Sequence, residues 1–341
     1  MISNSIKNKK DFWQKLKKTG RPILALAPMA GFSDSAFRQI CKKNGADVLY
    51  SEMASTAALY YLEKNPRKKL LAEGERLESE KTLDILRFER QKEKYFVAQI
   101  FGSKPEHFAV ATRIITEKIK PDGIDINFGC PVPKIIKQGA GSGLMKDLAR
   151  SREVIKAVLD NTNLPVSIKI RLESGPVNFK EFLTNISDLP ISALMIHGRT
   201  LKQGFVGPAD FKAIKEARKY FKGIILANGG IYDLKEAQKA LKESKAEGLG
   251  LGRGILGRPW LFKEIQKNKV IDKTRKGVFK LLLEHAELAH KLKGARATYE
   301  LRKNLCWYLR GLDGAAKLRE ALVKAESLRE IKKIFKPKKA C

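Results

Sequence analysis

The chain has 341 residues and is strongly basic, with 68 Lys and Arg against 37 Asp and Glu, a formal net charge of +31. Its length and its hydrophobic content of 43% are those of a globular protein that can bury a large core. No apolar run approaches the roughly 20 residues that cross a bilayer, and the N-terminus lacks a signal-peptide core. We therefore expect a cytoplasmic protein without a membrane partner.

The four cysteines are scattered without paired spacing, which argues against a disulfide framework and against a structural zinc site. They are Cys41, Cys130, Cys306 and Cys341. No His, Asp and Glu cluster has metal-ligand spacing, and no P-loop or nucleophile elbow occurs. The sequence therefore predicts separate thiols and no bound metal.

The basic charge is concentrated at the two ends of the chain. The first 20 residues contain six lysines against Asp11, and residues 263–341 carry 22 basic and 9 acidic side chains, a net charge of +13. A polyanion such as RNA suits this pattern, because neutralising phosphates releases condensed counterions. The alternative is a lysine-rich protein whose whole surface is basic.

In chain order, residues 1–20 form a basic extension in which Phe12, Trp13 and Leu16 predict a short helix or arm. Short apolar runs, typical of buried strands, then alternate with amphipathic stretches of helical period. The eight runs are 23–27, 48–51, 96–100, 123–127, 166–170, 193–197, 223–227 and 248–251. The helical stretches include 35–43, 106–119, 151–159, 179–186, 211–220 and 234–241.

Eight such units in series predict an α/β protein with a closed (β/α)8 TIM barrel over residues 21–262. An open doubly wound sheet is the alternative. The lysine-rich segment 67–94 is too polar for a core, and we expect it on the surface between the second and third strands. After Trp260 the strand pattern ends, and 278–292, 297–309 and 315–335 have helical period, with Gly294, Gly311 and Gly314 as breaks. A small C-terminal α-helical domain, 263–335, should therefore follow the barrel, before a basic tail at 336–341.

Chemistry in such barrels lies at the carboxyl ends of the strands. After the last two strands come Asn228-Gly229-Gly230 and Gly252-Arg253-Gly254, where barrels often bind phosphate through backbone N–H groups. Together these two motifs predict a phosphorylated cofactor, to which Arg253 can add a charge-assisted contact.

Three further side chains at strand ends are candidates for the site. Lys169 interrupts an apolar strand, and a lysine at a barrel mouth is costly unless it meets an anion or an electron-rich ring, which favours a cofactor contact over a snorkelling surface role. His197, beside Gly198 and Arg199, is either a cofactor or substrate ligand or a structural histidine. Cys130 follows the fourth strand in a loop that Pro131 and Pro133 make rigid, and its residues leave open a catalytic thiol or a buried apolar one.

These strand-end motifs, taken together and in order, resemble the tRNA-dihydrouridine synthase family. They are Ala27-Pro-Met-Ala-Gly31, Asn127-Phe-Gly-Cys-Pro131, Lys169-Ile-Arg171, His197-Gly-Arg-Thr200 with Gln203-Gly204, Asn228-Gly-Gly-Ile231, and Gly252-Arg-Gly254 with Gly257 and Pro259-Trp-Leu-Phe262. The resemblance spans roughly residues 22–310. Within the helical region, Arg302-Lys-Asn-Leu-Cys-Trp-Tyr308 is similar to the bacterial B-type branch, which usually has His where Asn304 stands.

The resemblance implies an FMN-binding barrel, a helical tRNA-binding domain, and NADPH or NADH as reductant. It implies that Cys130 is the general acid that protonates carbon 5 of a uridine while hydride reaches carbon 6. The implied cofactor-binding residues are Pro28, Met29, Ala30, Gln99, Lys169, His197, Asn228, Gly229, Gly230, Gly252 and Arg253. The implied substrate-binding residues are Asn127, Arg171, Arg199, Arg302 and Lys303, with tRNA as the partner and no obligate protein partner.

Two other functions fit part of the sequence. An FMN-dependent barrel that acts on a small molecule such as dihydroorotate would share the phosphate motifs, but has no need of a basic helical appendage. A noncatalytic RNA-binding protein would explain the charge without the strand-end motifs.

Overall fold

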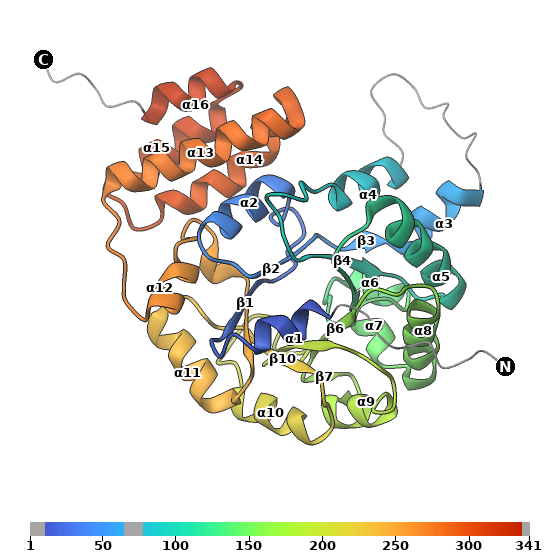
Figure 1. Cartoon of the computed structure of the whole chain (residues 1–341). Helices are drawn as coiled ribbons and strands as arrows, with labels where there is room; N and C mark the ends of the chain where they lie inside the picture. The colour runs from blue at the N-terminus through green and yellow to red at the C-terminus, as the bar shows by residue number, and fades with distance from the viewer. Residues whose placement is uncertain (1–10, 65–77, 336–341) are drawn as a thin grey trace, which may run out of the picture.

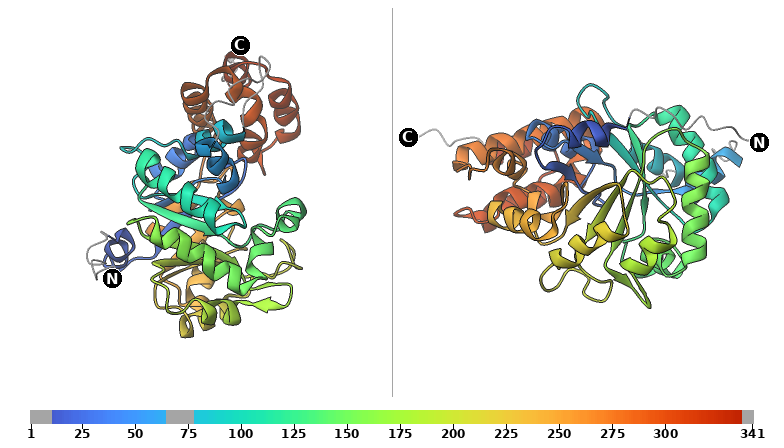
Figure 2. Two further views of the ribbon diagram at one scale, coloured as in Figure 1. Left: turned by 90° about the vertical axis from the view of Figure 1, so that its right-hand side faces the viewer. Right: turned by 60° about the horizontal axis from the view of Figure 1, so that its bottom comes forward.

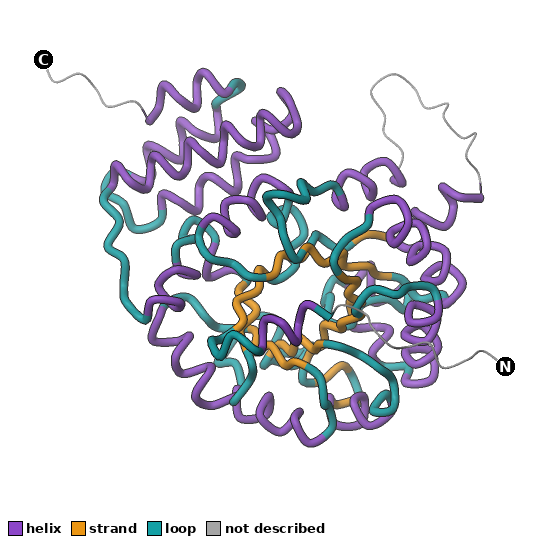
Figure 3. Tube along the Cα trace, viewed as in Figure 1, coloured by secondary structure: helices purple, strands orange, loops and turns teal. Residues whose placement is uncertain are grey.

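The computed structural model describes residues 11–64 and 78–335 and contains a closed sheet of eight parallel strands (Figures 1 and 3). The strands are β1 (Ile23–Leu26), β2 (Val48–Tyr50), β4 (Phe96–Phe101), β5 (Gly123–Asn127), β6 (Val166–Arg171), β9 (Ala193–His197), β10 (Ile224–Asn228) and β11 (Gly248–Leu251). They follow the order β2-β1-β11-β10-β9-β6-β5-β4, and pairing of β2 with β4 closes the circle. The predicted TIM barrel is confirmed, and the open sheet is wrong.

Helices surround the barrel and bury the outward-facing strand residues, such as Leu24, Ile126 and Ile168. They are α2 (Ser35–Lys43), α3 (Thr56–Lys64), α4 (Glu78–Leu86), α5 (Pro105–Ile114), α8 (Leu148–Asp160), α9 (Phe179–Asn185), α10 (Phe211–Glu216), α11 (Leu234–Ser244) and α12 (Leu261–Lys267). Helix α5 continues as a π-helical turn, Ile115–Ile119, and α10 as a 3₁₀ turn, Ala217–Lys219. Helix α12 runs across residue 262, where the sequence predicts the end of the barrel domain.

An aspartate begins four of the helices that follow strands. Asp34, Asp147, Asp210 and Asp233 each accept a backbone N–H of the first helical turn. Such a cap satisfies a donor that the helix itself leaves unpaired and complements the helix dipole. Each cap therefore fixes where its helix starts, and the caps of α2, α10 and α11 also mark where a strand-end loop stops.

The barrel interior changes from apolar to polar along the strands. Ile23, Val48 and Ile224 lie near the amino ends in an apolar cluster. Towards the carboxyl ends the inward positions hold polar side chains, because β-strand residues alternate between the two faces. These inward polar side chains include Gln99, Asp125, Asn127, Ser167, Lys169, Arg171, His197 and Asn228.

Helix α1 (Phe12–Lys17) closes the amino end of the barrel. Phe12, Trp13 and Leu16 are buried against the apolar cluster of the interior, and the Phe12 ring stacks on Tyr95 at 4.9 Å between centroids. The hairpin of β7 (Glu173–Ser174) and β8 (Val177–Asn178) lies at the opposite end (Figure 2). The sequence predicted the helix, and the structure shows that it plugs the barrel.

The C-terminal helices form a bundle beside the barrel (Figure 1). They are α13 (Arg275–Lys293), α14 (Ala297–Cys306), α15 (Ala315–Lys324) and α16 (Leu328–Phe335). Their apolar core includes Leu282, Leu301 and Leu322 and continues onto Ile40 of α2 and onto Trp260. Among the described residues, no helix is both long and apolar enough to cross a membrane.

A lysine at the end of α13 ties the bundle to the barrel through a partly buried ion pair. Lys293 Nζ donates to Asp34 at 2.6 Å and to Glu300 at 2.6 Å. Asp34 is also the N-cap of α2, which directly follows the first strand-end loop. The position of the bundle and the position of that loop are therefore linked.

Two predictions about segments require correction. The stretch 315–335 is not one helix, because the chain turns at Ala325 and Ser327 between α15 and α16. Of the expected surface segment 67–94, residues 67–77 lie outside the described part of the chain. At its far end Lys92 and Lys94 are exposed as expected, whereas Glu93 between them is fully buried and receives the Arg38 guanidinium at 2.5 Å.

Candidate active site

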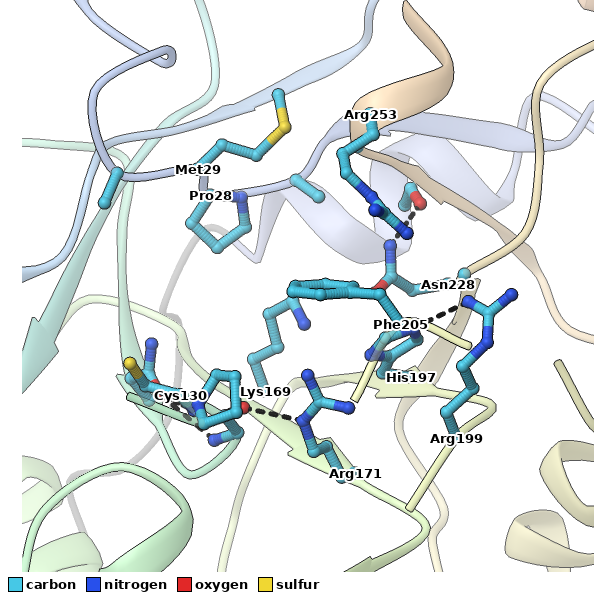
Figure 4. Close-up of a pocket in the computed structure, with 18 of the residues that line it drawn as sticks. Pro28, Met29, Cys130, Lys169, Arg171, His197, Arg199, Phe205, Asn228 and Arg253 are labelled. Atoms are coloured by element: carbon cyan, nitrogen blue, oxygen red, sulfur yellow. Dashed lines mark hydrogen bonds between the residues drawn. The ribbon is translucent and has the colours of Figure 1, made fainter. Parts of the chain in front are cut away.

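A cavity of about 350 Å³ opens at the carboxyl end of the barrel (Figure 4). Fifteen of the seventeen residues predicted for the site line it, and they come from the ends of seven strands. These residues are Pro28, Met29, Ala30, Gln99, Asn127, Cys130, Lys169, Arg171, His197, Arg199, Asn228, Gly229, Gly230, Gly252 and Arg253. Motifs scattered over more than 200 residues of sequence thus meet at one place.

The glycines of the last two strand ends differ in the room that they leave for a side chain. Gly229 has a φ of +105°, and a Cβ there would lie 2.4 Å from His197 Cδ2. The Asn228 amide donates to Gly250 O at 2.7 Å and joins the two neighbouring loops. At Gly252 a Cβ would meet nothing closer than Met29 Sδ at 3.7 Å, so the backbone there is open to the cavity.

Four cations face this cavity, and we call Lys169, Arg171, Arg199 and Arg253 the cationic cluster. None of the described residues that line the cavity is acidic. Burial, followed by the charge of Arg171, lowers the pKa of Lys169 from 10.5 to about 8. Burial lowers the pKa of Arg171 from 12.5 to about 10. A group of like charges that is partly desolvated favours an anionic ligand.

The cationic cluster also determines the state of His197. Burial and the four neighbouring cations lower the pKa of His197 from 6.5 to about 2, so the imidazole is neutral near pH 7. Its Nε2 lies 3.3 Å from an Arg199 nitrogen, which is a donor, so Nε2 is the acceptor there. His197 is therefore a neutral group that can offer a hydrogen bond without adding charge.

Two arginines of the cluster hold the loops around the cavity. Arg171 donates to Gly129 O at 2.9 Å and to Gly204 O at 2.9 Å, and so joins the loop after β5 to the loop after β9. Arg199 donates twice to Gly207 O, at 2.9 and 2.7 Å. These contacts fix the positions of the two guanidinium groups, which still line the cavity.

Cys130 lies in the loop after β5, and its side chain is almost fully buried at the cavity wall. Asn127 Oδ1 accepts the N–H groups of Gly129 at 3.0 Å and Cys130 at 2.9 Å. Burial raises the pKa of the Cys130 thiol above its ordinary 9.0, although Arg171 and Lys169 oppose this. The thiol therefore keeps its proton near neutral pH and can act as an acid.

The sequence analysis missed Phe205, which lies over the cavity among the cations (Figure 4). Its ring centroid is 4.2 Å from the Arg253 guanidinium, 5.6 Å from that of Arg171 and 6.2 Å from the His197 ring. The side chain is 52% exposed. An aromatic residue between Gly204 and Gly207, in a loop that directly follows a strand-end motif, is the signal that could have found it.

Arg302 and Lys303 lie outside this cavity. Arg302 donates to Ala325 O at 3.2 and 2.7 Å and covers the Tyr299 ring at 4.7 Å, so it holds the turn between α15 and α16. Lys303 Nζ lies 5.0 Å from the ring centroid of Phe32, which lines the cavity. Lys303 also borders a second cleft, of about 660 Å³, between the barrel and the helical bundle. The two predicted residues thus differ: Lys303 reaches the rim of the site and Arg302 does not.

Comparisons with known proteins identify the family of this chain. The family model described as dihydrouridine synthase matches residues 25–340. A probable tRNA-dihydrouridine synthase of Helicobacter pylori (strain J99) is 35% identical and covers 90% of each chain. The tRNA-dihydrouridine synthase B of Pseudomonas syringae pv. tomato is 32% identical and covers 87% of this chain and 85% of that protein.

Among solved structures, histamine dehydrogenase from Rhizobium sp. 4-9 superimposes with a TM-score of 0.54 at 12% identity, over 78% of this chain and 49% of that chain. At such low identity this likeness shows the fold alone. The match of the family model over nearly the whole sequence carries the assignment. The chain belongs to the dihydrouridine synthase family.

Proposed function

We propose that this chain reduces specific uridines of tRNA to 5,6-dihydrouridine, with FMN as its bound cofactor and NADPH or NADH as reductant. Cys130 is the general acid in this proposal. The observation that carries it is the meeting of a protonated thiol, the cationic cluster and a glycine-lined wall in one cavity of a dihydrouridine synthase. Residues 21–262 then form the FMN-binding barrel and 263–335 the tRNA-binding domain.

The cavity fits the phosphate of FMN on the side of β10 and β11. Gly230 and Gly252 bring the backbone to the cavity wall, and Arg253 faces the same space (Figure 4). Backbone N–H groups and an arginine are the donors that phosphate prefers in barrels. Asn228 holds these loops together through its hydrogen bond to Gly250 O, which supports a phosphate site there.

The remaining wall fits a flavin ring. Pro28, Met29 and Ala30 supply an apolar surface on one side, and Gln99, Lys169 and His197 supply polar groups on the other. When bound, FMN supplies the hydride for carbon 6 of the uracil after reduction by NADPH or NADH. A partly desolvated Lys169 and a neutral His197 suit hydrogen bonds to such a ring.

The residues around Cys130 fit the protonation of the base. The Cys130 thiol holds its proton and would deliver it to carbon 5 of the uracil, opposite the hydride. Asn127 and Arg171 present N–H groups near the thiol and would orient the uracil carbonyl oxygens. Phe205 is placed to stack on a base that enters the cavity.

A target uridine has to leave its stack to reach this cavity, at a cost of roughly a few kcal/mol. Contacts to the tRNA backbone can offset that cost. Arg199 in the cavity wall, Lys303 at the rim and the basic residues of the helical bundle would supply positive charge for such contacts. Arg302 contributes indirectly, because it supports Tyr299, which is 61% exposed on α14.

Flavin content and tRNA dependence test the proposed function. Protein reconstituted with FMN should show a flavin absorbance band, and unmodified tRNA should accelerate its oxidation of NADPH. A protein that stays colourless after reconstitution contradicts the FMN site. A flavoprotein whose NADPH oxidation ignores tRNA would instead support a small-molecule reductase.

A further inference from the structure

Asp125 lies in the middle of β5, beneath the cavity, and its side chain is fully buried inside the barrel. It does not line the cavity and has no role in the function proposed above. We propose that Asp125 is a positioning residue that fixes the Cys130 loop through Gln99 and Asn127. The catalytic meaning of this link rests on the proposed function, whereas the link itself is a property of the folded chain.

The link is a chain of hydrogen bonds that runs from Asp125 through Gln99 and Asn127 to the loop. The orientation of each side-chain amide is determined by its hydrogen-bond partner on the Asp125 side. Asp125 Oδ2 accepts from Gln99 Nε2 at 2.7 Å. An ionised carboxylate can only accept, so the amide nitrogen of Gln99 has to face it. The amide oxygen of Gln99 then points the other way and accepts from Asn127 Nδ2 at 2.9 Å.

The orientation of Asn127 completes the chain of hydrogen bonds. Since its nitrogen faces Gln99, its oxygen is free for the loop and accepts the N–H groups of Gly129 and Cys130 at 3.0 and 2.9 Å. A reversed Asn127 amide would bring N–H groups against N–H groups and release the loop. The carboxylate of Asp125 therefore selects the one orientation of the Gln99 and Asn127 amides in which Asn127 Oδ1 accepts the N–H of Cys130.

The other surroundings of Asp125 keep it in place. Its second oxygen accepts from Ser167 Oγ at 2.6 Å, and Ser167 Oγ lies 3.5 Å from the Tyr50 hydroxyl. Burial raises the pKa of Asp125 from 3.8 to about 6, whereas the hydrogen bonds from Ser167 and Gln99 and the charge of Lys169 oppose this rise, so the carboxyl is ionised at pH 7. A buried charge costs stability that an apolar side chain would not. In return, the charged carboxylate can only accept hydrogen bonds, so the amide nitrogen of Gln99 always faces it.

Two variants separate positioning from a general effect on the fold. Asp125→Asn no longer fixes the orientation of the Gln99 amide, because an asparagine can present either nitrogen or oxygen to Gln99. The double variant Asp125→Asn with Asn127→Asp restores an unbroken chain of hydrogen bonds in which the donor and acceptor at each side chain are exchanged. In it, the new amide at position 125 would donate to Gln99, and Gln99 would donate to the new carboxylate at position 127. That carboxylate again accepts both loop N–H groups.

The readout is the alkylation rate of Cys130 by iodoacetamide in the full chain, measured by mass spectrometry with Cys306 as internal reference. D125N should raise the Cys130 rate at least fivefold and leave the Cys306 rate unchanged, and the double variant should return it to within twofold of the unmodified chain. Asp122→Asn, the same change just before β5, is the matched control and should leave the Cys130 rate unchanged. Equal Cys130 rates in all four proteins would overturn the proposal.

Folding and turnover give the remaining outcomes. If D125N does not fold but the double variant does, the link is still supported. If neither variant folds, Asp125 is required for folding itself, and the proposal is overturned. In turnover, D125N should keep NADPH reduction of bound flavin within twofold and slow its reoxidation by tRNA at least tenfold. Equal slowing of both steps would contradict positioning. A parent chain that forms no dihydrouridine defeats the proposed function, while the alkylation rates still test the link.

Discussion

At Cys130, burial determines which protonation state the thiol keeps. The raised pKa of this thiol distinguishes an acid from a nucleophile, since a nucleophilic cysteine has a lowered pKa. Arg171 and Lys169 favour the thiolate, but the loss of hydration outweighs them. The local structure therefore suits proton donation.

The pH dependence of alkylation tests this point. Iodoacetamide reacts with the thiolate, so the rate at Cys130 should rise with pH through a midpoint above 9.0, the ordinary value for this thiol. Below that midpoint the proton is held and available for transfer. A midpoint below about 7, typical of activated cysteines, would contradict an acid role.

Gly229 offers a second test at the scale of one residue. Gly229→Ala adds a Cβ that would lie 2.4 Å from His197 Cδ2, at a φ of +105° that side chains rarely adopt. We expect the affinity for FMN, measured by quenching of its fluorescence, to fall at least tenfold. Gly20→Ala is the control, because φ there is +71° with nothing within 4 Å of the new Cβ. Equal FMN affinity in both variants would show that strain and crowding at Gly229 do not matter.

At the scale of elements, α1 is a small helix that covers the amino end of the barrel. Trp13 is fully buried within it, whereas Gln14 is exposed. Trp13→Ala should lower the free energy of unfolding by about 3–5 kcal/mol, the usual cost of deleting a buried aromatic side chain. Gln14→Ala should change it by less than about 0.5 kcal/mol. Urea denaturation measures both, and equal stabilities would show that α1 does not seal the barrel.

The strands could be predicted from the sequence because apolar runs end at glycine or polar residues. The run at 123–127 matches β5 at both ends, where Gly123 and Asn127 bound it. The division of 315–335 could not be predicted, since neither glycine nor proline marks the turn between α15 and α16. Burial of Glu93 was missed for another reason: its partner, Arg38, lies 55 residues away.

The same contrast applies to the site. Strand-end motifs predicted the cavity residues, because parallel strands bring their carboxyl ends together. Asp125 and Phe205 lie outside these motifs. The role of Asp125 depends on hydrogen bonds between strands, and Phe205 reaches the cavity by the path of its loop.

At the scale of the whole molecule, the helical bundle brings Lys303 to within 5.0 Å of the ring of Phe32, which lines the cavity. Lys303→Ala should weaken tRNA binding and reduce the slope of log affinity against log salt by about 1, as expected for loss of one phosphate contact. Lys239→Ala, on the outside of the barrel in α11, is the control and should leave the slope unchanged. An unchanged slope in both variants would place the RNA elsewhere.

The central claim, a uridine reduction completed by the Cys130 proton, is tested most directly on unmodified tRNA with FMN and NADPH. After nuclease digestion, mass spectrometry should detect dihydrouridine with the parent chain and with Cys306→Ala. Cys130→Ala should bind FMN and oxidise NADPH but form dihydrouridine at least about 100-fold more slowly, within the usual contribution of a general acid. Dihydrouridine formed by Cys130→Ala at the parental rate would contradict the account.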